Sequence, residues 1–171
     1  MDVRILISKL RTAVKGRVIA PEEAGYDQAR AVFYGWVDRR PLVIVRVSDE
    51  IDVSRVVSLA RETGLELAIR SGGHSLAGHS VSEGGVVIDL SDMRALQIDV
   101  EKRLAWAQTG LTAGEYTATA DAYGLATGFD DTGSVGNTWR QQRSHTAGDG
   151  SWRQSARCTI IPRMRTCTRS G

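Results

Sequence analysis

Hydrophobic residues recur at helical spacing at the start of the chain. One face of a predicted amphipathic helix is formed by Val3, Leu6, Ile7, Leu10 and Val14. Gly16 is placed to end this helix, since glycine commonly follows the last helical turn. Residues 26–34 predict a second, shorter helix.

A strand, a helix and a second strand are predicted between about residues 41 and 70. Pro41 opens the run PLVIVRV, which is typical of a buried strand. Residues 48–50, Ser-Asp-Glu, supply a helix cap and an acidic first turn, and Gly64 ends the helix. The helix is expected to bury Val53, Val56, Val57 and Ala60. Residues 65–70 then alternate at strand period, so we expect a βαβ-like unit with a parallel pair of strands.

The remaining elements complete a mixed fold. Further strands are predicted over residues 84–89, 96–100 and 103–108. Thr112 and Glu115 fit a capping box, so a helix is expected from there to Tyr123, with Gly124 as its stop. The fold class is therefore α/β (or α+β), and the predicted domain ends near Gly136.

Composition and charge divide the chain at that point. Its 171 residues are 42% apolar and 25% charged, as in soluble globular proteins, with a net charge of +2. Residues 1–136 carry 15 basic and 19 acidic side chains, whereas residues 137–171 carry seven arginines and one aspartate. This second segment lacks Leu, Val, Phe, Tyr, Lys and Glu and cannot build a core. We expect a poorly ordered basic tail, of the kind that translation out of frame would produce.

The cysteines and the N-terminal residues indicate the compartment. Cys158 and Cys167 both lie in the tail, so no disulfide framework supports residues 1–136, which suits a reducing compartment. The two cysteines, with only His145 nearby, make a poor metal site. The start of the chain has no signal-peptide pattern, and no stretch is long and apolar enough for a membrane helix. We expect a cytoplasmic protein.

The loop of residues 70–75, Arg-Ser-Gly-Gly-His-Ser, is the most informative stretch for function. Consecutive glycines permit positive φ and let backbone N–H groups converge on an anion, while Arg70 adds positive charge. The loop therefore predicts a pyrophosphate cradle, although it is neither a Rossmann motif nor a P-loop. The same residues also suit a plain glycine-rich turn with a surface histidine. Composition alone favours neither interpretation over the other.

Four motifs stand in order along residues 41–136. They are PLVIV at 41–45, LELAIRSGGHSLAGHS at 65–80, GGVVIDLSDM at 84–93 and GLATGFDDTGSVG at 124–136. In this order they resemble the FAD-binding domain of the berberine-bridge-enzyme-like oxidases, within the wider vanillyl-alcohol-oxidase (PCMH-type) flavoprotein family. The resemblance begins near residue 26 and covers about two thirds of the chain.

The resemblance implies FAD as the cofactor. His74 would carry FAD covalently through the 8α-methyl carbon of the isoalloxazine, and the main chain of residues 70–75 would hold the pyrophosphate. His79 and Ser80 would lie beside the flavin and its adenosine diphosphate part. The implied cofactor-binding residues are Arg70, Ser71, Gly72, Gly73, His74, Ser75, His79, Ser80, Gly110, Asp131, Thr132, Gly133, Ser134, Val135 and Gly136.

Members of the family with two flavin bonds carry a cysteine in the loop that corresponds to residues 131–136. Thr132 takes that position, which implies a single covalent bond. No catalytic residue is assigned, because the family's base comes from farther downstream.

Other candidate residues have plainer interpretations. His79 suits a hydrogen-bonding loop residue as well as a flavin contact, and Asp89 suits a strand-end cap better than a base. Trp36 and Trp106 are expected in the core or in an interface.

The family reaction would move a hydride from an alcohol or an activated C–H bond to FAD, which O₂ reoxidises. The family's substrate domain is not seen in this sequence, so we expect an FAD-binding fragment with weak or no turnover. Apolar surface that such a domain would cover predicts self-association. One alternative is a non-catalytic truncated product. Another is a polyanion-binding module that uses the tail arginines, although the absence of lysines and of a folded motif disfavours nucleic acid.

Overall fold

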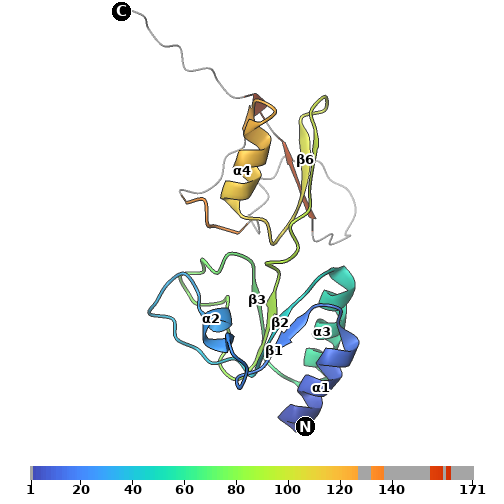
Figure 1. Ribbon diagram of the computed structural model, residues 1–171, viewed down its shortest axis with the longest axis vertical. Helices are drawn as coiled ribbons and strands as arrows, with labels where there is room; N and C mark the ends of the chain where they lie inside the picture. The colour runs from blue at the N-terminus through green and yellow to red at the C-terminus, as the bar shows by residue number, and fades with distance from the viewer. Residues whose placement is uncertain (1, 127–131, 137–154, 160, 163–171) are drawn as a thin grey trace, which may run out of the picture.

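The structure is a computed structural model that describes residues 2–126, 132–136, 155–159 and 161–162, the last two ranges as backbone only. A four-stranded sheet with helices on both faces forms one part, and a smaller sheet with one helix forms the other (Figure 1). The mixed α/β class predicted from the sequence is confirmed.

The elements alternate between helix and strand through most of the chain. The helices are α1 (Val3–Ala13), α2 (Tyr26–Arg30), α3 (Glu50–Thr63) and α4 (Ala113–Asp121). The strands are β1 (Arg17–Ile19), β2 (Val43–Arg46), β3 (Leu67–Arg70), β4 (Val86–Asp89), β5 (Leu96–Asp99), β6 (Leu104–Gln108), β7 (Leu125–Ala126), β8 (Ser155–Thr159) and β9 (Ile161–Pro162).

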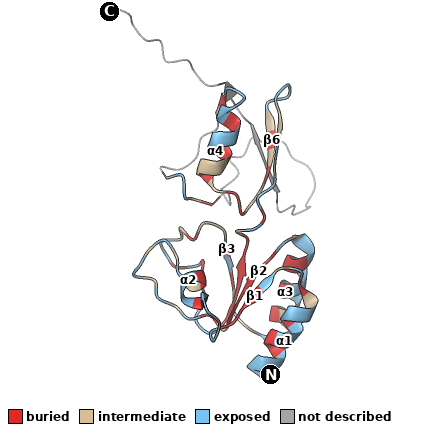
Figure 2. Cartoon of the chain, in the orientation of Figure 1, coloured by how far each residue is buried: buried red, intermediate tan, exposed pale blue. Residues whose placement is uncertain are grey.

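The larger sheet has the order β1-β2-β4-β3, with β1 antiparallel and the other strands parallel. The strands on either side of α3 are parallel, as predicted, but they are not neighbours: β2 and β3 each pair with β4 and not with one another. All four residues of β4 are buried, which fits a strand at the centre of a sheet covered on both faces. The strands lie as a buried layer between helices whose outer faces are exposed (Figure 2).

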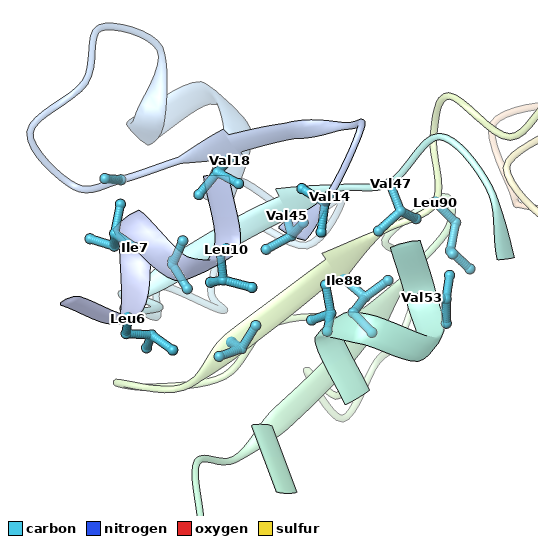
Figure 3. Close-up of a cluster of buried hydrophobic side chains, with 14 of the residues drawn as sticks. Leu6, Ile7, Leu10, Val14, Val18, Val45, Val47, Val53, Ile88 and Leu90 are labelled. Carbon is cyan, nitrogen blue, oxygen red and sulfur yellow. The ribbon is translucent and has the colours of Figure 1, made fainter. Parts of the chain in front are cut away.

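The main hydrophobic core lies between this sheet and the helices α1 and α3 (Figure 3). The predicted stripe of α1 is buried through Leu6, Ile7 and Leu10. In α3 the buried stripe is narrower than predicted, because Val57 is 40% exposed. The helix instead buries Asp52 in its first turn, where this side chain accepts hydrogen bonds from the neighbouring backbone.

The helix ends follow local chemistry. Asp49 caps α3, Gly64 ends it with φ of +67°, and Thr112 and Glu115 form the predicted capping box of α4. α1 ends before Gly16 is reached. Gly16 instead allows a close backbone approach, since a Cβ there would lie 2.1 Å from the Arg46 carbonyl oxygen.

The two sides of residues 65–70 alternate as predicted, but the apolar side is only partly buried: Leu65 and Leu67 pack against the main core cluster, and Ile69 does not. Ala68 and Arg70 are buried, whereas Ile69 is 54% exposed. The reason is that β3 is an edge strand of the sheet. Ala68 packs in the second core cluster with Val87, and Arg70 pairs with Asp89 on the same face.

The smaller sheet has the order β5-β6-β8, and all its pairs are antiparallel. α4 packs on it through Tyr116 and Ala120, against the small side chains Ala105 and Ala107 of β6. Strands β8 and β9 lie within the predicted tail, and β8 pairs along the length of β6. The rest of residues 137–171 lies outside the described residues, so a separate tail remains a prediction.

The two tryptophans differ. Trp36 is 70% exposed in a loop and lies against Tyr34 with ring centroids 4.5 Å apart. It therefore does not pack in the core, and the alternative of an interface stays a prediction. Trp106 lies half-buried on β6. Among the described residues, the helices are too short or too polar to cross a bilayer.

The Asp52 carboxylate joins α3 to the α1–β1 connection. Its two oxygens accept hydrogen bonds from the backbone N–H groups of Lys15 and Gly16, both at 2.9 Å, and of Ser48 at 3.1 Å. Replacing Asp52 by alanine leaves these donors without their acceptor, so we expect the free energy of unfolding to fall by about 3 kcal/mol. Chemical denaturation measures this change. Glu50→Ala, in the same helical turn but exposed, is the control and should cost under about 1 kcal/mol; equal losses in the two variants would contradict the assignment.

Candidate functional site

The glycine-rich loop begins directly where β3 ends at Arg70 (Figure 1). The backbone N–H groups of residues 71–75 donate to no other residue within the described part of the chain. Consecutive N–H groups left without an acceptor are the donors that an anion such as a pyrophosphate requires. The loop therefore fits the diphosphate of FAD.

The two glycines of the loop serve different purposes. Gly73 has φ of +74°, in the left-handed region where glycine is favoured. Gly72 is needed for space, because a Cβ there would lie 2.3 Å from the backbone nitrogen of Gly136 and 2.7 Å from the carbonyl oxygen of Ser134. The two predicted cofactor loops thus meet at Gly72.

The second loop, residues 132–136, is fixed to the start of α4. The backbone N–H groups of Ala113 and Gly114 donate to the carbonyl oxygens of Val135 at 2.9 Å and Gly133 at 2.8 Å. Thr132 places its hydroxyl 3.3 Å from that of Ser134. The helix therefore presents this loop to the glycine-rich loop.

A further contact joins the two parts of the chain behind these loops. The Ser71 hydroxyl donates a hydrogen bond to the carbonyl oxygen of Thr109, which follows β6. Gly110 passes so close to the end of β4 that a Cβ would lie 1.8 Å from the Leu90 carbonyl oxygen. Gly110 is thus required by backbone packing next to the site, and its direct contact with a cofactor remains a prediction.

The side chain of Arg70 turns into the protein. Its guanidinium donates to an Asp89 carboxylate oxygen at 3.0 Å and to the Ala31 carbonyl oxygen at 3.3 Å. Arg46 reaches the same Asp89 oxygen at 3.1 Å. The positive charge of Arg70, which the sequence predicts to face the pyrophosphate, is therefore paired with the buried carboxylate of Asp89.

Asp89 acts as the predicted strand-end cap, since its carboxylate accepts the backbone N–H of Ser91 at 3.1 Å. Burial favours the neutral acid, but Arg70, Ser91 and Arg46 outweigh it and hold the pKa of Asp89 below its ordinary value. A carboxylate whose pKa is lowered and which is paired with two arginines accepts a proton weakly, and this argues against a role for Asp89 as a base near neutral pH.

His74 lies half-buried at the end of the glycine pair. Its imidazole stacks on the ring of Phe33, with centroids 4.0 Å apart and planes inclined by 24°. Farther along, the Ser75 hydroxyl accepts the backbone N–H of His79 at 3.1 Å. The His79 side chain is exposed, whereas Ser80 is buried.

Two residues near the loop were not singled out from the sequence. Phe33 donates its backbone N–H to the carbonyl oxygen of Gly73 at 3.2 Å. Arg39 donates to the carbonyl oxygens of Gly78 and Val81, both at 3.0 Å. Both residues brace the loop from a segment far earlier in the chain, so neither spacing nor composition indicates them.

Some predicted residues cannot be placed. Asp131, His145 and Cys167 lie outside the described residues, and only the backbone of Cys158 is described. Within the described part of the chain, no three side chains of the metal-ligating types gather in one place.

Asp89 makes stability depend on acidity. Because its pKa is lower in the folded protein, the unfolded chain binds more protons, and stability is lost as the pH falls through the folded value. Asp89→Asn should cost roughly 3–5 kcal/mol near neutral pH, since Arg70 remains buried without its partner. It should also flatten the decline in unfolding free energy below about pH 5. Urea denaturation over a pH series tests this, with exposed Asp92→Asn as the control; parallel pH profiles for Asp89→Asn and the unmodified chain would refute it.

The loop contact at Gly72 gives a second prediction. Gly72→Ala forces a methyl group into the backbone of the second loop, so we expect a loss of about 2 kcal/mol in unfolding free energy. Gly35→Ala is the matched control, because nothing lies within 4 Å of a Cβ at that position. The same unfolding midpoint for both variants in thermal melts would show that the loops do not meet as described.

Comparison with known proteins covers both loops. The chain matches the family described as FAD binding domain over residues 41–152. It is 36% identical to (R)-6-hydroxynicotine oxidase of Paenarthrobacter nicotinovorans over 121 residues, which cover 70% of this chain and 26% of that protein. It is 34% identical to berberine bridge enzyme-like 9 of Arabidopsis thaliana over 101 residues, 58% of this chain and 18% of that protein.

A solved structure shares the fold. The crystal structure of 6-hydroxy-D-nicotine oxidase from Arthrobacter nicotinovorans superposes with a TM-score of 0.70 at 33% identity, over 72% of this chain and 27% of that one. The chain thus spans about a quarter of the length of these oxidases. It belongs to the FAD-binding domain family, in the group that includes 6-hydroxynicotine oxidase and the berberine-bridge-enzyme-like proteins.

Proposed function

We propose that this chain binds FAD between its two loops and is the flavin-binding part of a flavin-linked oxidoreductase. The observation that carries the proposal is the set of backbone N–H groups at residues 71–75, which have no acceptor among the residues that the structure describes. The loop that carries them is held against residues 132–136 through Gly72. These donors suit the diphosphate, because several N–H groups pointing at one anion replace its hydration without a mobile charged side chain.

His74 is the proposed point of covalent attachment. It follows the glycine pair directly, it lies only half-buried, and its ring rests on Phe33. An imidazole nitrogen of His74 would bond to the 8α-methyl carbon of the isoalloxazine. Thr132 occupies the loop position that a second, cysteine-linked bond would need, so a single attachment is proposed.

Bound FAD would accept a hydride from an alcohol or an activated C–H bond of a small molecule and pass the electrons to O₂. The described residues contribute to binding and orientation: N–H groups for the diphosphate, His74 for the ring and residues 132–136 for the second side of the cofactor. Turnover also requires a group that holds a substrate carbon against the flavin. We assign none of these residues to that role, and we expect the isolated chain to bind FAD with weak or no turnover.

The histidines separate covalent binding from simple binding. The purified full chain, incubated with FAD, should be yellow, and flavin fluorescence should remain with the chain in a denaturing gel. His74→Ala should lose the fluorescence in the gel, because the bonding nitrogen is gone. Its colour before denaturation shows whether it still binds FAD without the bond. His145→Ala, which removes a histidine distant in sequence from the loop, should keep it.

The outcomes differ in meaning. A colourless chain after exposure to FAD would refute flavin binding itself. A yellow chain that releases all its flavin on denaturation would refute the attachment and leave the FAD-binding role in place. Gel fluorescence that persists in His74→Ala would show that another residue carries the flavin.

A further inference from the structure

We infer that Phe33 is a positioning residue for the attachment of FAD, which it serves by holding the imidazole of His74 in one orientation. The inference rests on the proposed function and extends it to a residue outside both loops. Phe33 lies 41 positions before His74 in the sequence, yet their rings stack with centroids 4.0 Å apart. A planar contact of this kind covers one face of the imidazole and restricts its rotation.

The segment that carries Phe33 is itself anchored to the loop. The Phe33 N–H donates to the carbonyl oxygen of Gly73, the residue directly before His74. Two residues before Phe33, the carbonyl oxygen of Ala31 accepts a hydrogen bond from the buried Arg70 guanidinium at 3.3 Å. The position of the phenyl ring is thus fixed relative to the backbone from which the imidazole extends.

Neighbouring aromatic rings support the phenyl ring. Phe33 meets Tyr34 edge to face at 5.1 Å, and Tyr34 lies against Trp36. Phe33 is nevertheless 55% exposed, so burial in the core does not account for its position. What its exposed ring does contact is His74, the side chain on which attachment depends.

Orientation matters because attachment is a bond-forming reaction. The bond joins an imidazole nitrogen to the 8α-methyl carbon; the nitrogen and the carbon each lose one hydrogen, and the two electrons pass with two protons to dioxygen, giving hydrogen peroxide. The imidazole must present a nitrogen to the methyl group, and a ring held by stacking loses less freedom in reaching that geometry. The stack therefore favours the reaction without contacting the diphosphate.

The stack can be tested before any cofactor is added. In the flavin-free full chain, the ring protons of His74 should resonate upfield, because they lie over the Phe33 ring. Phe33→Leu should abolish this shift and Phe33→Tyr should preserve it. Tyr123→Leu, which removes an exposed aromatic ring just after α4, should leave it unchanged. An unshifted His74 signal in the unmodified chain would overturn the inference at this step.

The attachment rate is the second measurement. After FAD is added, flavin fluorescence that survives denaturation should appear roughly 2- to 10-fold more slowly in Phe33→Leu, the range expected for an aromatic pair. Phe33→Tyr should restore the rate, and Tyr123→Leu should match the unmodified chain. A further comparison separates positioning from loop stability. FAD affinity is measured in His74→Ala, which cannot form the bond, and in the double variant His74→Ala/Phe33→Leu. The two affinities should be equal.

Each failure has its own signature. Equal attachment rates in Phe33→Leu and the unmodified chain would overturn the positioning role and leave the proposed function standing. A loss of FAD affinity in the double variant would show instead that Phe33 supports the loop as a whole, which also overturns the inference. Absence of attachment in the unmodified chain would overturn the proposed attachment and this inference together.

Discussion

The carboxylate of Asp89 is the interaction on which the site depends. It ends the central strand β4 and pairs with arginines at the ends of both neighbouring strands, Arg46 of β2 and Arg70 of β3. A buried carboxylate between two guanidinium groups holds three strand ends together, and removal of Asp89 takes this partner from both arginines. Because the glycine-rich loop begins immediately after Arg70, its starting point is fixed by this cluster.

From this cluster the site is built outward by backbone contacts. Arg70 also holds the Ala31 carbonyl, which anchors the segment that carries Phe33. The loop is held by close packing and by its flanking side chains, so its backbone N–H groups have no acceptor within the described residues. Rigidity without occupied donors is the condition that an anion site requires.

Much of the fold could be predicted from local sequence. The caps of α3 and α4 depend on residues within a few positions of each helix end. The roles of Asp49, Gly64 and the Thr112–Glu115 capping box could therefore be predicted. The exposure of Ile69 was not, because it depends on β3 lying at the edge of the sheet. Contacts across long separations, such as Gly72 with Gly136, depend on the tertiary fold and leave no local pattern.

The site residues divide in the same way. His74 was identified through the motif around it, since a histidine after two glycines is recognisable within a family. Phe33 and Arg39 belong to no recognisable motif, because their roles come from tertiary contacts and not from their spacing in the sequence.

The attachment of the second loop to α4 has a consequence for the whole chain. Residues 132–136 are hydrogen-bonded to the start of α4, the helix that packs on the smaller sheet, whereas residues 71–75 extend from the larger sheet. A ligand that binds both loops therefore connects two separately packed cores. Such a ligand acts as a non-covalent cross-link, so the two halves of the chain would melt together when it is present at high concentration and more independently when it is scarce.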